Sequence, residues 1–407
     1  MIKLIQKKGA LILASIFLLL SSFDSADKTL YKIDVDGKLG FIDNKGNEVI
    51  KPQYLFVSDF SEGLAVVVID TTIIKSESFF SRDSITYRYG YINTKNKRVL
   101  DANYLYTEAF DDNVKESLAN RSITFRNLQF FNDRAVYQDK NNNKFGFINK
   151  KGEVVINPIY YGAQRFSESL AAVDFVGWEP GTDREHKWGY ININGEIVIE
   201  GKYTFAKDFY DDRAIVFIAD YGDESLPFEE RLINHYFLVI DKSGHIIGSP
   251  FNTILNIIYG DFREGYCMVQ QLDMFDRDYL AYKFIDKNGE YTTDFEMEEV
   301  TSFSNGYAGV KTEDGWVFVD PSFNIVSNEY YDDVYSFSEG YAAVKKGRKW
   351  GYIDTTFAQV IPYRFDEGGH FKNSLVPYKI KTQSLSITGY IDKKGEIVWQ
   401  HQSFEYD

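Results

Sequence analysis

Residues 341–363 read YAAVKKGRKWGYIDTTFAQVIPY, and this stretch decides the fold. Its short apolar runs are rich in Ala, Val, Ile and Tyr and are separated by a turn at Gly347 and another after Asp354. Short runs of this composition between such turns predict strands. The Asp354 carboxylate can accept a backbone N–H two residues on, which favours a tight hairpin. The stretch therefore predicts a three-stranded antiparallel meander over residues 341–345, 350–354 and 359–361.

The central strand of this meander recurs nine times along the chain. The copies end in Asp or Asn at positions 43, 93, 149, 192, 241, 286, 320, 354 and 392. Around them the same features recur in order: a Gly turn, an apolar strand, a Pro/Tyr segment, an aromatic before a polar turn such as FSEG at 337–340, and a final strand. The shortest spacing is 34 residues. A unit of that size cannot bury its own apolar face, so neighbouring units must stack into one array.

The repeated pattern resembles the bacterial WG-repeat family, also called KWG-repeat proteins, over about residues 30–400. The Trp-Gly pair is complete at Trp188-Gly189 and Trp350-Gly351, whereas the fifth to seventh copies lack the Gly. The resemblance implies a β-structured repeat protein. It implies no activity and brings no catalytic residues to carry over.

We therefore predict an all-β fold of tandem antiparallel β-meander repeats, about nine units, forming an open curved array or a propeller-like toroid. Residues 30–33 match the final strand of a unit, and 389–399 match the first two strands of one. Together they could complete a ninth unit and close a ring; otherwise both ends cap an open array. The array is predicted as a single domain, 27–407, with units starting near 39, 89, 145, 188, 236, 282, 316, 350 and 389. Many of the aromatic residues are expected to fill the seams between units.

The first residues differ from the rest. Three lysines precede an apolar run over residues 10–23, which is the layout of a secretory signal peptide. The run is short for a membrane anchor. We predict a signal peptide over residues 1–26, an exported protein without a membrane span in the mature chain, and an uncleaved anchor as the alternative.

Composition excludes several classes of protein. The chain of 407 residues carries 60 acidic and 45 basic side chains and a net charge of −15, which argues against nucleic acid as a partner. A hydrophobic content of 44 % excludes a disordered chain, and one cysteine excludes a disulfide scaffold or a thiolate metal cluster. That residue, Cys267, occupies a strand position where other units carry Ala and is predicted to be a buried apolar residue.

The candidate chemistry is sparse. The turns at Asp34 and Asp286 imitate calcium loops but lack the twelfth-position Glu, so hairpin turns explain them better. The five His residues have no zinc-helix spacing, and adjacent acidic pairs point to opposite faces of a strand. We predict no catalytic residues, no metal and no cofactor.

Insertions are the best candidates for binding because loops held by a rigid scaffold carry function. Four of them, at 70–88, 174–187, 219–235 and 270–281, join the last strand of one unit to the first strand of the next, and a fifth lies at 111–130. If the units superpose, the four share one edge. Trp178, Glu179 and Phe228 in these loops are the predicted binding residues. The alternative is that these insertions are exposed turns whose sequences have drifted and that they bind nothing.

Two functional hypotheses follow, together with a passive spacer. The first is a monomeric, non-enzymatic scaffold that binds a protein or glycan partner in the bacterial cell envelope. The second is a carbohydrate-active enzyme on a propeller-like ring. It predicts carboxylates from different units converging at the centre, at least one with a strongly shifted pKa.

Overall fold

A computed structural model describes residues 29–74, 83–110, 125–177, 186–220, 234–252, 256–258, 260–272 and 280–404. These residues form antiparallel sheets and one short 3-10 helix, with no α-helix among them. None of the described segments is therefore a helix of the length and apolarity needed to cross a membrane. The predicted signal peptide lies outside the described residues.

The strands form successive meanders, which we number as units 1 to 9 by their central strands. Unit 1 contains β1 (Tyr31–Val35), β2 (Lys38–Ile42) and β3 (Glu48–Tyr54), and unit 2 contains β4 (Phe56–Val57), β5 (Leu64–Ile74), β6 (Asp83–Asn93) and β7 (Arg98–Phe110). Unit 3 contains the 3-10 helix η1 (Arg126–Leu128), β8 (Ala135–Gln138), β9 (Phe145–Ile148) and β10 (Val154–Tyr160). Unit 4 contains β11 (Gly162–Ala163), β12 (Leu170–Asp174), β13 (Trp188–Asn192) and β14 (Ile197–Tyr203).

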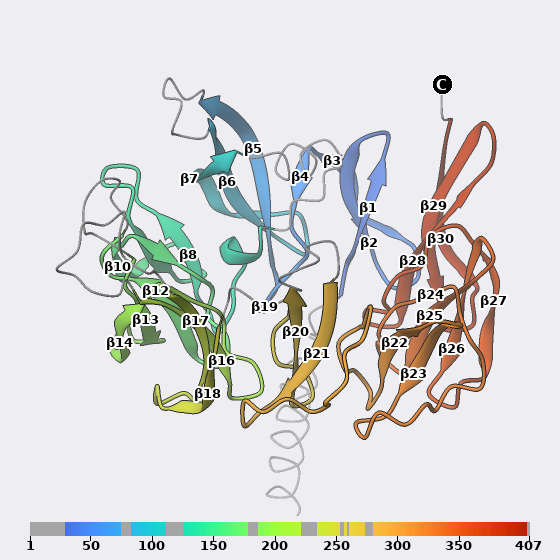
Figure 1. Ribbon diagram of the computed structural model, residues 1–407. Helices are drawn as coiled ribbons and strands as arrows, with labels where there is room; N and C mark the ends of the chain where they lie inside the picture. The colour runs from blue at the N-terminus through green and yellow to red at the C-terminus, as the bar shows by residue number, and fades with distance from the viewer. Residues whose placement is uncertain are drawn as a thin grey trace, which may run out of the picture.

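The remaining units complete the array (Figure 1). Unit 5 contains β15 (Phe205–Ala206), β16 (Ala214–Asp220), β17 (Asn234–Ile240) and β18 (Ile246–Asn252), and unit 6 contains β19 (Asn256–Ile258), β20 (Tyr266–Leu272) and β21 (Leu280–Asp286). Unit 7 contains β22 (Ala308–Thr312) and β23 (Gly315–Val319). Unit 8 contains β24 (Asp333–Val334), β25 (Tyr341–Lys346), β26 (Lys349–Asp354) and β27 (Gln359–Phe365), and unit 9 contains β28 (Leu375–Lys381), β29 (Leu385–Asp392) and β30 (Ile397–Phe404).

The predicted fold class is confirmed: the protein is an all-β array of antiparallel meanders. Strands β25, β26 and β27 form the meander expected from residues 341–363. Most sheets combine the final strand of one sequence repeat with the first two strands of the next, whereas the sheets of units 6 and 7 contain only the first of these two strands. Units 2 and 3 are joined through the pairing of β7 with β8, so their strands form one seven-stranded sheet.

The Asp or Asn at the end of each central strand acts as predicted. In all nine units its side-chain oxygen accepts the backbone N–H groups two and four residues on. In unit 6, the Asp286 carboxylate accepts the N–H groups of Asn288 and Glu290 at 2.8 and 3.1 Å. The calcium-like turn at Asp286 is therefore a hairpin turn stabilised by its own backbone.

The glycine of the Trp-Gly pair allows the third strand to bulge. The register of β26 with β27 shifts between Trp350 and Tyr352, and the carbonyl of Ile361 projects toward Gly351. A Cβ atom on Gly351 would lie 2.7 Å from that oxygen. Units 6 and 7 have Lys283 and Val317 in place of the glycine, and there the third strand is reduced to isolated bridges, whereas unit 5 has Leu238 at this position and keeps β18 with a register shift. The glycine is therefore tied to a close approach of two backbones.

The seams between units are aromatic, as expected. In seven seams the aromatic of a central strand packs on a Phe of the next unit, with ring centroids 4.8–5.3 Å apart. This Phe immediately precedes a polar turn, such as residues 338–340 before β25, which we call the inner turn of its unit. These pairs are Phe41–Phe60, Tyr91–Phe130, Phe147–Phe166, Tyr190–Phe209, Phe284–Phe303, Phe318–Phe337 and Tyr352–Phe371. Edge-on and tilted rings at such distances are favourable beyond their buried area.

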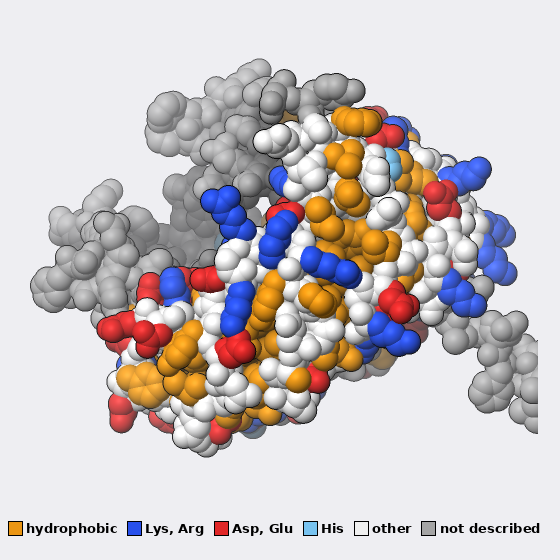
Figure 2. Space-filling view, turned by 90° about the vertical axis from the view of Figure 1, so that its right-hand side faces the viewer, with side chains coloured by type: hydrophobic (Ala, Val, Ile, Leu, Met, Phe, Trp, Pro, Cys, Tyr) orange, Lys and Arg blue, Asp and Glu red, His pale blue; other side chains and the backbone are white. Residues whose placement is uncertain are grey.

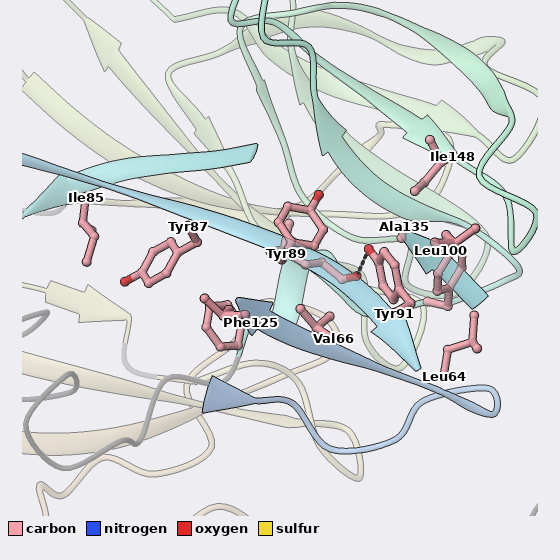
Figure 3. Packing of buried hydrophobic residues seen from close by; sticks show 13 residues of the cluster. Leu64, Val66, Ile85, Tyr87, Tyr89, Tyr91, Leu100, Phe125, Ala135 and Ile148 are labelled. Atoms are coloured by element: carbon pink, nitrogen blue, oxygen red, sulfur yellow. Dashed lines mark hydrogen bonds between the residues drawn. The ribbon is translucent and has the colours of Figure 1, made fainter. Parts of the chain in front are cut away.

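The seam between units 2 and 3 is the most tyrosine-rich. Tyr87, Tyr89 and Tyr91 lie on one face of β6 and are fully buried (Figure 3). The Tyr91 hydroxyl donates to the backbone carbonyl of Leu128 at 2.7 Å, so this seam also fixes the short helix η1. Burial raises the pKa of Tyr89 and that of Tyr91.

The polar turn after the seam Phe links neighbouring units, a role that the sequence did not suggest. Glu264 of unit 6 accepts the N–H groups of Asn305 and Gly306 in unit 7, at 2.7 and 2.8 Å. Backbone N–H groups of the next unit likewise donate to the side-chain oxygens of Glu62, Glu168, Asp211, Asn305 and Glu339. We call these contacts the turn belt.

Lysines of the hairpin turns reinforce the turn belt. Lys150 contacts Glu62 of the preceding unit at 3.1 Å, and Lys242 contacts Glu168 at 3.0 Å. Lys393 contacts Glu339 at 3.2 Å. Glu62, Glu168 and Glu339 therefore each have both a cation and a backbone donor from the next unit.

The turn belt predicts a pH-dependent contribution to stability. Burial alone would raise the pKa of Glu339, but the N–H of Ser374 and the Lys393 ammonium outweigh it and lower the pKa. A carboxyl with a depressed folded-state pKa stabilises above its unfolded value, near 4.5, and that contribution is lost as the pH falls through the folded value. Glu339→Gln should therefore lower the unfolding free energy by about 1–2 kcal/mol at pH 7 and by much less at pH 3.5.

Urea unfolding of both proteins at the two pH values measures this difference. Glu313→Gln, in the exposed turn between β22 and β23, is the matched control and should change little at either pH. A Glu339→Gln effect of equal size at pH 7 and pH 3.5 would show that the carboxylate charge is irrelevant.

The first and last units meet (Figure 1). Tyr31 and Ile33 of β1 pack with Leu375, Tyr390 and Trp399 of unit 9. The Tyr390 hydroxyl donates to the carbonyl of Lys32 at 2.8 Å, and Lys372 of unit 9 reaches past unit 1 to pair with Asp59 of unit 2 at 2.8 Å. The ends do not share a sheet, because β1 pairs with β2 and β28–β30 form a sheet of their own. The propeller-like toroid is therefore closed by packing between complete sheets rather than by strand exchange.

Candidate functional site

The predicted binding residues Trp178, Glu179 and Phe228 lie outside the described residues. The base of the insertion that carries Trp178 is described, and it is rigidly held. Asp174 is buried and accepts the N–H groups of Val176, Gly177 and Lys187 at 2.9–3.2 Å. Its second oxygen lies 2.5 Å from Nδ1 of His186. One buried carboxylate thus ties together both ends of this insertion.

A cavity opens at the seam where the ring closes. Its volume is ≈ 270 Å³, at the small end of ligand sites, which span about 300–1,000 Å³. We call it the closure pocket. It is lined by Lys32, Ile33, Asp34, Glu367, Gly368, Pro377, Tyr378, Lys379, Thr388, Gly389, Tyr390 and Trp399. The pocket therefore lies where unit 1 packs against unit 9.

Strand register explains which side chains meet in the closure pocket. Tyr390 pairs directly with Trp399 on β30, so these two rings share one face of the last sheet. Thr388, two residues before Tyr390, shares that face with its partner Lys379 on β28. The wall thus combines an apolar aromatic surface with a hydroxyl and an ammonium group.

Charged groups border the aromatic wall. Lys379 pairs with Glu367 at 3.2 Å, and Glu367 is largely exposed. Asp34 lies on the opposite wall, and His401 lies 3.1 Å from Asp36 across the seam. The pocket therefore offers hydrogen-bond donors and acceptors on both sides of an aromatic surface.

The surface beside the last units is also partly apolar. Figure 2 shows hydrophobic side chains gathered on the side formed by these units, with Lys and Arg side chains around them. On β30, Ile397 and Phe404 are exposed. These residues provide matched positions for testing the role of Trp399 on the same strand.

A second group of polar side chains gathers where the inner edges of units 3 to 6 meet. Arg126 comes from unit 3, Arg165 from unit 4, Lys207, Asp208 and Tyr210 from unit 5, and Asp261 from unit 6. Both arginines donate to the Tyr210 hydroxyl. We call these six residues the inner cluster. Arg126 extends from unit 3 past unit 4 to residues of units 5 and 6. It therefore joins parts of the chain that are distant in sequence.

Ion pairs order the inner cluster. Arg165 lies 3.2 Å from Asp208, and Lys207 lies 3.1 Å from Asp261. The Arg165 guanidinium also sits 4.1 Å above the ring of Phe131. Arg126 approaches Asp208 and Asp261 at the longer distances of 3.6 and 3.9 Å. Arg165 is therefore fully engaged, while Arg126 is held more loosely.

Asp208 is the most unusual group of the inner cluster. Its side chain is 7 % exposed, and its Oδ1 atom has no hydrogen-bond partner among the described residues. Burial raises the pKa of Asp208, and the charge of Asp261 adds to this, although Arg165 and Arg126 act in the opposite direction. Carboxylates from two units thus meet around Arg126, with a cation against each of them.

The single cysteine is part of a sheet. Cys267 is buried in β20, and burial raises the pKa of its thiol to about 12. Within the described ranges, no three His, Cys, Asp or Glu side chains are arranged to hold a metal ion.

Comparison with known families identifies the repeat. The model of the WG containing repeat matches residues 40–70, 145–174, 188–220, 284–316, 318–350 and 350–381. The chain belongs to the WG-repeat family. Each matched stretch of this WG-repeat protein begins at or within the central strand of one unit and extends into the next unit. A search of curated proteins found no relative.

Solved structures similar to the WG-repeat protein are distant in sequence. Apo AztD from Citrobacter koseri is 11 % identical, with 93 % of this chain and 97 % of that chain covered and a TM-score of 0.34. The β-propeller domain of the Trilobed protease from Pyrococcus furiosus is 10 % identical, with 83 % and 95 % covered and a TM-score of 0.36. Dihydro-heme d1 dehydrogenase NirN is 12 % identical, with 84 % and 74 % covered and a TM-score of 0.37.

Sequence reasoning missed both the closure pocket and the inner cluster. A signal for the cluster exists, because Arg165, Asp208 and Asp261 each immediately precede the seam Phe of their unit. Aligning that position across units would have shown charged residues in three successive units, 4 to 6, and otherwise only Asp59 in unit 2. The closure pocket has no such signal, because it depends on contact between the two ends of the chain.

Proposed function

We propose that this WG-repeat protein is an exported, non-enzymatic scaffold that binds a glycan of the cell envelope in the closure pocket. The single observation that carries the proposal is the closure pocket itself. It combines the Trp399 and Tyr390 rings with Thr388 and the Lys379–Glu367 pair in one small cavity. Export rests on the predicted signal peptide of residues 1–26.

The chemistry of the pocket favours a sugar over a protein segment. A sugar ring offers a C–H face that packs on an aromatic ring and hydroxyls that need both donors and acceptors. Tyr390 already donates its hydroxyl to Lys32, so its ring is fixed before any ligand arrives. A fixed aromatic wall reduces the entropy lost on binding. The small volume suits a terminal sugar or a short glycan stretch.

Binding of a panel of neutral oligosaccharides to the full chain, read by glycan array and then by calorimetry, tests the proposal. Trp399→Ala should weaken the best binder by tenfold or more, equivalent to about 1.4 kcal/mol. Phe404→Ala, which removes an exposed aromatic from the same strand, should leave binding unchanged. Absence of glycan binding by the unaltered chain, or equal losses in the two variants, would contradict the proposal.

One observation favours the alternative, a carbohydrate-active enzyme. Asp208 and Asp261 converge from different units, and the pKa of Asp208 is raised. Two carboxyls about 5–10 Å apart across a cleft are the requirement for glycoside hydrolysis. Hydrolysis of the bound oligosaccharide that is abolished by Asp208→Asn would replace the scaffold proposal with this one.

A further inference from the structure

We propose that the inner cluster is a second binding site, for an oxyanion, in which Arg126 and Tyr210 hold a carboxylate or phosphate group. This inference is independent of the glycan site, because the inner cluster is built by units 3 to 6 and the closure pocket by units 1 and 9.

Arg126 has unused binding capacity. Its Nη2 atom donates to Tyr210, and its approaches to Asp208 and Asp261 at 3.6 and 3.9 Å are too long for hydrogen bonds. The side chain is 49 % exposed. A guanidinium presents a planar fork of donors that matches carboxylate and phosphate oxygens. Arg126 therefore keeps donors available toward solvent.

The residues before Arg126 fix the position of its side chain and do not compensate its positive charge. Phe125 adopts a left-handed backbone conformation with φ 48°, a conformation that costs a non-glycine residue about 1–3 kcal/mol. Its ring is held against Tyr87 in the buried seam at 5.4 Å. The strained residue immediately before Arg126 is thus anchored by the core, and this fixes the direction in which Arg126 leaves the backbone.

Tyr210 completes the site. Its hydroxyl oxygen already accepts from two arginines, so its own hydrogen can be donated outward. An oxygen of the ligand at that position would receive the Tyr210 hydroxyl and lie beside both guanidinium groups.

The local charge supports an anionic ligand. Within the inner cluster, Arg126, Arg165 and Lys207 carry three positive charges, against two on Asp208 and Asp261. The complete chain carries −15. Because the molecule as a whole is acidic, an anion would be attracted to this positive region and not to the surface in general. Asp208 and Asp261 hold the cations in place.

Calorimetric titration of the full chain with acetate, which has no sugar ring, and, separately, with inorganic phosphate tests the site and distinguishes a carboxylate from a phosphate ligand. Arg126→Gln should weaken the effective probe by tenfold or more, and Arg126→Lys should weaken it several-fold because the charge stays and the fork is lost. Tyr210→Phe should weaken it severalfold, and raised salt should weaken binding to the unaltered chain.

Arg88→Gln is the matched control. Arg88 is 48 % exposed and lies 3.6 Å from Asp70, so its exposure and ion pair resemble those of Arg126. It should leave oxyanion binding unchanged, as should Trp399→Ala in the closure pocket. Thermal unfolding of each variant checks that the fold is intact. Binding of neither probe at 10 mM (about 30 times a Kd of 0.3 mM), or equal losses for Arg126→Gln and Arg88→Gln, would overturn the proposal.

Discussion

Phe166→Ala should lower the unfolding free energy by about 3–5 kcal/mol, the largest effect expected for a single side chain in this protein. Phe166 is 1 % exposed and its ring lies 4.8 Å from that of Phe147 in the preceding unit. Truncation leaves a cavity between two sheets that cannot collapse, because the backbones on both sides are fixed by strand pairing and by the turn belt. Ser167, the next residue, donates to the Phe209 carbonyl of the following unit at 2.6 Å.

Urea unfolding monitored by circular dichroism measures this loss. Phe404→Ala removes a ring that is 70 % exposed and should change the unfolding free energy by less than about 1 kcal/mol. Similar losses in the two variants would mean that the aromatic seams do not stabilise the array.

Gly351→Ala should destabilise the protein by about 1–3 kcal/mol or more. The added Cβ atom would lie 2.7 Å from the Ile361 oxygen and 3.0 Å from the Tyr363 nitrogen. Both are backbone atoms of β27, so relief requires that the bulged strand move away from β26. Faster hydrogen exchange of the backbone amides of β27 would accompany the loss of stability.

Gly369→Ala is the control for this substitution. Gly369 has no positive φ, and its nearest contact would be the side-chain Cγ of Pro377 at 3.4 Å, an ordinary distance. Its replacement should cost less than about 1 kcal/mol. Equal losses at the two glycines would show that the bulge does not explain the Gly of the Trp-Gly pair.

Local patterns in this sequence predicted local structure well. The Asp turns, the meander of β25–β27 and the seam position of residues such as Phe337 follow from hydrogen bonding and hydrophobic burial within one or two repeats. Cys267 is buried where the neighbouring repeats carry Ala. These features depend on a few residues on either side, and the repeat shows each of them several times.

Contacts between units were harder to predict. The Ser-Glu-Gly turn resembled an ordinary polar turn, but Glu339 accepts N–H groups from the next unit because the stacking places them there. The closure pocket requires Asp34 and Lys379, which are separated by almost the whole chain. Strand periodicity assigns a face to each residue but does not place one end of an array beside the other.

The distance between the first and last units in solution tests the central claim, ring closure, most directly. Spin labels at Lys45 and Lys394 occupy equivalent turn positions in units 1 and 9, and labels at Thr356 and Lys394 occupy them in the neighbouring units 8 and 9. The burial that raises the pKa of Cys267 to about 12 keeps the native thiol from competing for the label. Pulsed electron resonance should give one narrow distance for each pair, of similar length, because unit 9 has a neighbour on both sides. A long or broad distribution for Lys45 and Lys394 alone would show that the array is open and that the closure pocket does not persist.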